Sequence, residues 1–165
     1  MQIITAGRTG PNRSVRFGGD AVLGDRGRSS VLGLAASMTR AVDTCGPETA
    51  TRETAALLGA AGTVVVDDAL RTLDVGGWAG LSPEEVDPVE LGAWFTDPRA
   101  RPHGGESVVD FVDRVHSWRS GQAGPRDRCL VVAMPVAQAL LCSDASRFFE
   151  HDVRPATLYT CTDAR

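Results

Sequence analysis

Short segments of strand character alternate with helical segments along most of the chain, and this alternation restricts the fold more than any other feature. β-Branched and other apolar residues cluster in five segments that we expect to be strands: 2–5, 41–45, 63–67, 128–133 and 158–162. Helical spacing or helix-start signals predict helices over 25–38, 47–58, from 82 onward, 107–118 and 136–141. The alternation predicts an α/β fold, a three-layer sandwich with a mainly parallel sheet flanked by helices.

The order of these segments also predicts where chemistry occurs. In a parallel sheet, sites form at the carboxyl ends of the strands. The turns that follow Thr5, Cys45, Val66 and Ala133 are therefore the expected site region. Asp25 is expected to cap the first helix, and Pro47 suits the first turn of the second.

The length and net charge of the chain limit the number of domains and the kinds of partner that we expect. Its 165 residues fit one domain over 1–165, and its net charge of -4 shows no basic stripe for nucleic acid. The longest apolar runs, such as 129–134, are too short to cross a bilayer, and no signal peptide is recognisable. We therefore expect a cytoplasmic protein without nucleic-acid or membrane partners.

The four cysteines indicate no metal site. Their spacings, at Cys45, Cys129, Cys142 and Cys161, match no zinc motif, and no cofactor is predicted. We expect them to be small buried apolar residues, although a reactive thiol at Cys45 stays open.

Four stretches, in order along the chain, carry a resemblance to a known family. They are Ile-Ile-Thr-Ala-Gly-Arg-Thr-Gly-Pro-Asn at 3–12, Cys-Gly-Pro-Glu-Thr-Ala-Thr-Arg-Glu-Thr-Ala at 45–55, Leu-Arg-Thr-Leu-Asp-Val-Gly-Gly-Trp-Ala-Gly at 70–80, and 102–114 with the strand and helix of 131–140. The chain resembles the histidine phosphatase superfamily, the phosphoglycerate-mutase-like group, in the order and spacing of these stretches. The resemblance implies a phosphoglycerate-mutase-like fold.

The resemblance also shows where the chain departs from the family. Two catalytic histidines, two arginines and an acid carry the family's phosphoryl transfer. At those five positions this chain has, respectively, Ala6 and Met134, Thr5 and Ala50, and Thr72. Loss of a covalent nucleophile alone costs roughly 10⁶ in turnover in a protease example. The resemblance therefore implies a degenerate member that lacks both catalytic histidines and has an uncharged pocket.

Two functions remain open at this point. The first is a pseudophosphatase, a binding or regulatory domain without phosphatase or mutase turnover. The second is reuse of the pocket for non-phosphoryl chemistry, such as acid/base hydrolysis, cyclisation or isomerisation, on a neutral small molecule. A neutral small molecule or a protein is the expected partner, and the chain is expected to be a monomer or homodimer.

A few polar residues near the expected site are candidates for these roles. The candidate acids or bases are Glu106, His103 and Asp74, and each has a structural alternative. Glu106 could hold the backbone N–H groups of its loop, His103 could form a local hydrogen bond, and Asp74 could form a turn. The candidate ligand-binding residues are Arg8, Asn12, Glu106, His103 and Met134. His116 and His151 are expected on the surface, away from the site.

Overall fold

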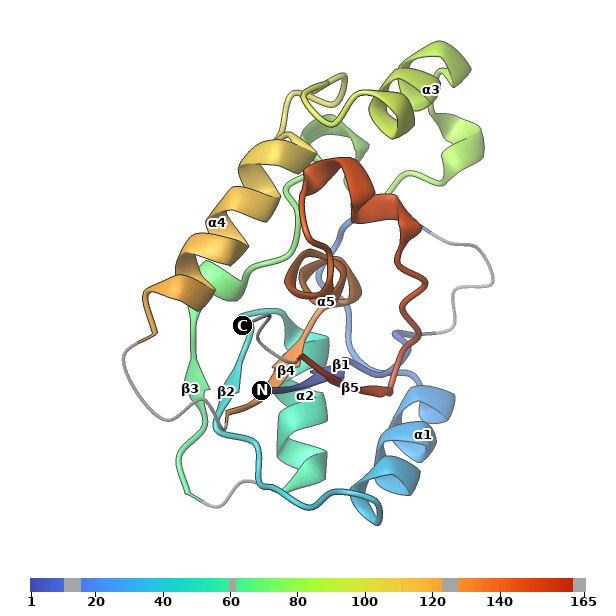
Figure 1. Cartoon of the computed structure of the whole chain (residues 1–165). Coiled ribbons are helices and arrows are strands. Elements are labelled where there is room, and N and C mark those ends of the chain that lie inside the picture. Colours follow the sequence, from blue (N-terminus) through green and yellow to red (C-terminus); the bar gives the residue numbers. More distant parts are fainter. Residues whose placement is uncertain (11–15, 60–61, 123–127, 162–165) are drawn as a thin grey trace.

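The computed structural model describes residues 1–10, 16–59, 62–122 and 128–161, and within them a five-stranded sheet forms the centre (Figure 1). The strands lie in the order β3–β2–β4–β1–β5. Their bounds are β1 Gln2–Thr5, β2 Thr44–Cys45, β3 Val65–Val66, β4 Cys129–Val132 and β5 Leu158–Thr160. All neighbours are parallel except β1 and β5, which run antiparallel, so the predicted fold class is confirmed.

In the described ranges, five α-helices and four short 3-10 helices accompany the sheet. The α-helices are α1 Asp25–Ala35, α2 Thr49–Leu58, α3 Pro88–Thr96, α4 Val108–Ser120 and α5 Met134–Leu141. The 3-10 helices are Asp68–Leu70, Gly76–Trp78, Pro83–Glu85 and Ala145–Glu150. None of the helices in these described ranges is long and apolar enough to cross a membrane.

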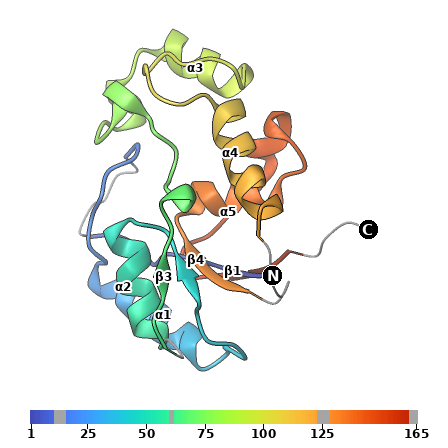
Figure 2. The same ribbon diagram turned by 90° about the vertical axis from the view of Figure 1, so that its left-hand side faces the viewer.

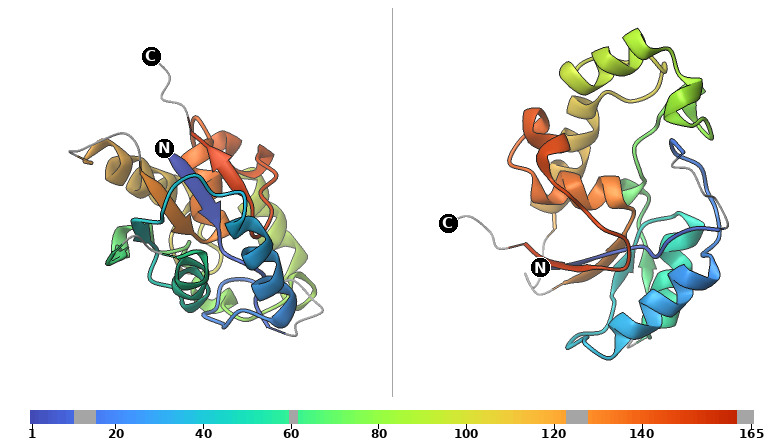
Figure 3. Two further views of the ribbon diagram at one scale, coloured as in Figure 1. Left: turned by 90° about the horizontal axis from the view of Figure 1, so that it is seen from below. Right: turned by 90° about the vertical axis from the view of Figure 1, so that its right-hand side faces the viewer.

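Alternation along the central strands divides the core into two layers. Successive side chains of a strand point to opposite faces of the sheet. Ile3 and Leu130 therefore pack in one cluster with residues of α4 and α5, whereas Ile4 and Val131 pack in a second cluster with Ala55 of α2. Helices α1 and α2 cover one face and α4 and α5 cover the other, while α3 stands beyond α4, away from the sheet (Figures 2 and 3).

Two helix starts differ from the sequence-based expectation. Gly24, not Asp25, is the N-cap of α1, and Asp25 is the first helical residue, where a carboxylate still favours the helix N-terminus. The helix expected from 82 onward begins later, as α3. Asp87 caps it by accepting hydrogen bonds from the backbone N–H groups of Val89 and Glu90, and Pro88 occupies the first position. The expected start at Ser82 produces only a 3-10 turn with a capping box.

Candidate functional site

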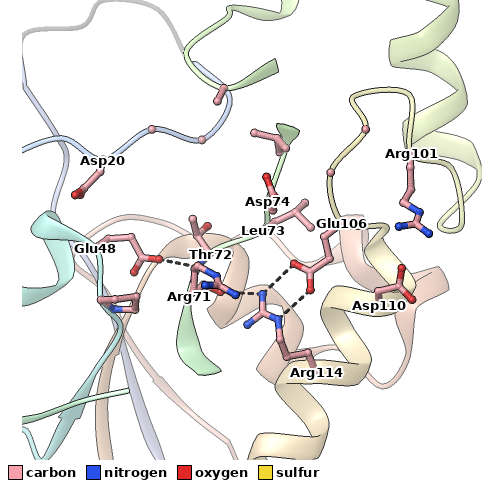
Figure 4. A pocket seen from close by; sticks show the side chains of 17 residues that line it. Asp20, Glu48, Arg71, Thr72, Leu73, Asp74, Arg101, Glu106, Asp110 and Arg114 are labelled. Atoms are coloured by element: carbon pink, nitrogen blue, oxygen red, sulfur yellow. Dashed lines mark hydrogen bonds and ion pairs between the residues drawn. The ribbon is translucent and has the colours of Figure 1, made fainter. Parts of the chain in front are cut away.

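A large cavity of about 930 Å³ opens on the carboxyl side of β2 and β3 (Figure 4). Its volume is within the range of small-molecule sites. Seventeen residues line it: Gly18, Gly19, Asp20, Pro47, Glu48, Arg71, Thr72, Leu73, Asp74, Val75, Ala79, Arg101, Gly104, Gly105, Glu106, Asp110 and Arg114. The cavity therefore lies at the carboxyl ends of two predicted strands, and loops that are distant from one another in sequence form most of its wall.

Backbone contact between two loops builds one wall of the cavity. The N–H of Glu106 donates to the carbonyl of Asp74 at 2.8 Å, and the N–H of Gly77 donates to the carbonyl of His103 at 2.9 Å. A Cβ on Gly76 would lie 2.2 Å from the carbonyl oxygen of His103, and one on Gly105 would lie 2.2 Å from that of Asp74. Only glycine fits at both positions, because the two backbones touch there.

An ion pair fastens this wall to helix α4. Arg114 donates from Nε and Nη2 to the two carboxylate oxygens of Glu106, each at 2.9 Å, in a bidentate arrangement. The same guanidinium also donates to the carbonyls of Ala69 and Arg71, at 2.7 and 3.1 Å. Glu106 is thus committed to Arg114, and the structure favours its structural role over that of a free acid or base.

Glu48 stands at the opposite side of the cavity, directly before helix α2. Its Oε1 accepts a hydrogen bond from the backbone N–H of Thr72 at 2.6 Å. Its Oε2 is buried and has no partner within the described part of the chain. A buried polar atom without a partner is uncommon and costly, and this oxygen, which lies against Gly46, is closed to solvent in the structure.

The other carboxylates of the cavity are engaged in local structure. Asp20 accepts from the backbone N–H and the hydroxyl of Thr49, at 2.6 and 2.9 Å. Asp110 accepts from the hydroxyl of Ser107 at 2.7 Å, and Asp74 accepts from the N–H of Gly76 at 2.9 Å. Asp74 is exposed and forms the turn that its sequence context suggested.

The expectation of an uncharged pocket is wrong for this cavity. Three arginines, Arg71, Arg101 and Arg114, line it together with five carboxylates. No hydrogen bond or ion pair joins the guanidinium groups of Arg71 and Arg101 to any residue in the described ranges. Arg71 and Arg101 have no motif or spacing that indicates a site in the sequence, because contacts between loops distant in the chain bring them to the cavity.

The positions expected to line an open pocket are instead largely filled. Ala6 and Ala50 are 8% and 7% exposed and pack together with Leu23 and Leu57. Thr5 is fully buried; its hydroxyl accepts from the N–H of Thr157 at 3.0 Å and so fastens β1 to the segment before β5. Small residues at these positions allow the neighbouring leucines to pack against them.

Two of the predicted ligand-binding residues lie outside the cavity lining. Arg8 is exposed and Met134 is 41% exposed at the start of α5, and neither lines the cavity. The segment 18–20 and the loop after β3 form the wall of this cavity in their place, and a role of Arg8 and Met134 as ligand contacts stays a prediction. Asn12 lies outside the described residues. Thr72 does line the cavity, half-buried, through its position next to Arg71.

His103 is buried behind the wall and is not in the cavity lining. Its Nδ1 accepts from the N–H of Gly105 at 3.0 Å, the local hydrogen bond that was the structural alternative at this residue. Its ring packs at 5.1 Å from that of Trp78 and 6.1 Å from that of Trp94. Burial lowers the pKa of His103, and the carboxylate of Asp74 opposes this in part. The ring is therefore neutral, and its role as a ligand contact is not supported.

The remaining histidines and the cysteines are structural. His116 is not a free surface residue: its Nε2 lies 2.7 Å from the carbonyl of Ala139 and links α4 to α5. His151 is half-buried, and its carbonyl accepts from Gln138. The cysteines are free; Cys45, Cys129 and Cys142 are buried, as expected, and Cys161 is half-buried.

The parallel sheet, the covering helices and a cavity at the strand ends define a phosphoglycerate-mutase-like α/β protein. The chain belongs to the histidine phosphatase superfamily (branch 1), whose family model matches residues 3–162. The curated glucosyl-3-phosphoglycerate phosphatase of Mycolicibacterium vanbaalenii is 46% identical over 54 residues, which are 31% of this chain and 24% of that protein. That match thus spans about a quarter of the length of the curated relative.

Solved structures show the same likeness over most of the chain. The mycobacterial glucosyl-3-phosphoglycerate phosphatase in complex with VO3 is 25% identical, with a TM-score of 0.79 over 96% of this chain and 90% of that one. A structure described as mycobacterial hydrolase 2 is 26% identical, with a TM-score of 0.81 over 96% and 79% of the two chains. The mycobacterial phosphatase is also known with inorganic phosphate, at 25% identity and a TM-score of 0.76 over 96% and 86%.

These comparisons contradict the function expected from the sequence. Relatives named as phosphatases, one of them solved with VO3 and with phosphate, oppose the interpretation of the chain as a pseudophosphatase or as an enzyme of non-phosphoryl chemistry. The expectation rested on the loss of the family's catalytic residues at Thr5, Ala6, Ala50, Thr72 and Met134. The structure has a charged cavity that is lined mostly by other residues.

Proposed function

We propose that this chain hydrolyses a phosphate monoester in the large cavity, with water as the attacking group. The family match and the phosphatases among its relatives support the reaction class. In this proposal Ala6 and Met134 occupy the positions of the family's two catalytic histidines, so no phosphohistidine forms. Water attacks phosphorus, the ester P–O bond breaks, and the alcohol leaves with a proton.

Glu48 carries the proposal as the general base. Its Oε1 is held by the N–H of Thr72, while its buried Oε2 has no partner in the described ranges. In this proposal the carboxylate turns when the ester binds, so that Oε2 reaches the cavity, accepts a proton from the attacking water and passes it to the leaving oxygen. A positioned general base of this kind typically raises the reaction rate by about 10²–10⁴-fold.

Arg71 and Arg101 supply the positive charge that a phosphoryl group requires. Both line the cavity, and neither guanidinium is paired within the described chain, unlike that of Arg114. A guanidinium binds phosphoryl oxygens through a planar fork of N–H donors. The carboxylates of the cavity oppose a dianion, which predicts modest affinity for free phosphate.

The other expectations from the sequence remain part of the proposal. They are one domain over 1–165, a cytoplasmic location, a monomer or homodimer, and a small-molecule partner without nucleic acid or membrane.

The proposal is tested by measuring inorganic phosphate released from a panel of phosphate monoesters. Glu48→Gln keeps the size of the side chain and removes its basicity, so turnover should fall about 100-fold or more. Glu90→Gln is the matched control, because Glu90 is exposed on α3 and does not line the cavity. No release above that of heat-inactivated protein, or full turnover in Glu48→Gln, would refute the proposal.

A further inference from the structure

We infer that a second, smaller cavity binds a phenyl-sized apolar group of the substrate, which makes the substrate a phosphate monoester of an arylalkyl alcohol. The inference rests on the proposed function for the phosphoryl end of that molecule. It goes further by assigning the part of the ester that does not react.

The small cavity is lined mainly by aromatic and aliphatic side chains. Its volume is about 150 Å³, and its lining residues are Arg16, Phe17, Gly18, Thr72, Leu73, Val75, Trp94, Pro135, Gln138, Phe148 and Phe149. An apolar cavity of about 150 Å³ is large enough to bind benzene. Size and lining together therefore favour a single aromatic ring over a sugar, whose hydroxyl groups would lose water without finding enough polar partners.

The small cavity adjoins the large one. Four residues line both: Gly18, Thr72, Leu73 and Val75. Arg71, which we assign to the phosphoryl group, immediately precedes this shared segment. A short ester can therefore place its phosphoryl group in the charged cavity and its ring in the apolar one.

The aromatic side chains that line the small cavity contact one another edge to face. The ring centroid of Trp94 lies 5.0 Å from that of Phe149, at an interplanar angle of 71°. It lies 5.7 Å from that of Phe17, at an interplanar angle of 90°. Such edge-to-face contacts are favourable for aromatic rings, and a bound ring can extend the same pattern. Phe149 is 36% exposed, so a guest against it would remove apolar surface from water.

Titration calorimetry with two inert phosphonates tests the inference without requiring turnover. Benzylphosphonate and methylphosphonate carry the same anionic group on a stable P–C bond and differ by the ring. We expect benzylphosphonate to bind about 10-fold more tightly or better, since burial of a ring is worth at least that factor. Equal affinities, or no binding of either compound, would overturn the inference.

Three variants locate the effect. Phe149→Ala should remove most of the preference, and Gln138→Phe should remove it by filling the cavity from α5. Phe95→Ala is the matched control: Phe95 belongs to the same aromatic cluster, 4.9 Å from Phe149, but does not line the cavity, so the preference should persist. A preference that survives both lining variants would place the ring elsewhere and refute the inference. A clear preference without phosphate release from benzyl phosphate would instead refute only the proposed hydrolysis.

Discussion

Replacing Ala6 by histidine tests whether the space beside β1 is filled. The methyl group of Ala6 packs with Leu23 and Ala50, and Ala6 is 8% exposed. Its backbone is also fixed, since its N–H donates to the carbonyl of Val132 at 2.9 Å and its carbonyl accepts from Ala156 at 3.1 Å. An imidazole added here therefore has neither room nor freedom to move away.

The expected cost follows from two effects. Overpacking a filled site costs about 1–3 kcal/mol, and a buried ring nitrogen without a partner costs about 1–3 kcal/mol more. Ala6→His should therefore lower the free energy of unfolding by about 2–6 kcal/mol. For a chain of this length each kcal/mol corresponds to about 2–4 °C, so the Tm should fall by about 4–24 °C.

Differential scanning calorimetry and urea unfolding measure this directly. Val22→His, at a position 55% exposed, is the control and should change the Tm little. Leu23→Ala removes the neighbour, so the double variant Ala6→His/Leu23→Ala should be more stable than the two separate costs predict, by about 1 kcal/mol or more. A wild-type Tm for Ala6→His, or strictly additive costs, would show that the space is open and refute this reasoning.

Two further predictions concern titration and thiol chemistry. Burial lowers the pKa of His103, and Asp74 only partly offsets this, so the unfolded state binds a proton at this imidazole more readily than the folded state does. The free energy of unfolding should therefore fall as the pH drops below about 6.5. Urea unfolding of His103→Gln should show a flatter pH dependence. Burial raises the pKa of Cys129 and of Cys142 to about 11, so at pH 8 iodoacetamide should label half-buried Cys161 first in native protein, as peptide mass mapping would show; equal labelling of all three would contradict the structure.

Much of the fold could be predicted from local sequence. The β-branched strand segments and the apolar stripe of 107–118 predict β1, β4 and α4 closely, because burial on one face imposes a period that is readable in sequence. The start and extent of α3 could not be predicted, because its apolar residues show no clear stripe: Trp94 is buried, whereas Val89 is 81% and Phe95 50% exposed. The Asp87-Pro88 pair was the available signal.

The site was less predictable, because its wall depends on contacts between distant segments. Glu48 and Thr72 are 24 residues apart, and Arg114 reaches the carbonyl of Ala69 across 45 residues. Periodicity and motif spacing carry no information about such contacts. Resemblance to a family directed attention to Ala6 and Met134, where the family has its chemistry, whereas in this chain the charged groups line a neighbouring cavity.

Single-turnover analysis of a radiolabelled phosphate monoester, with protein in excess, tests the central claim most directly. Labelled phosphate and labelled protein are followed together after alkaline quenching, which preserves phosphohistidine. Hydrolysis by water in the Glu48 cavity predicts that phosphate appears while the protein stays unlabelled at every time point. Protein-bound label, or an ester that remains intact throughout, would contradict the account.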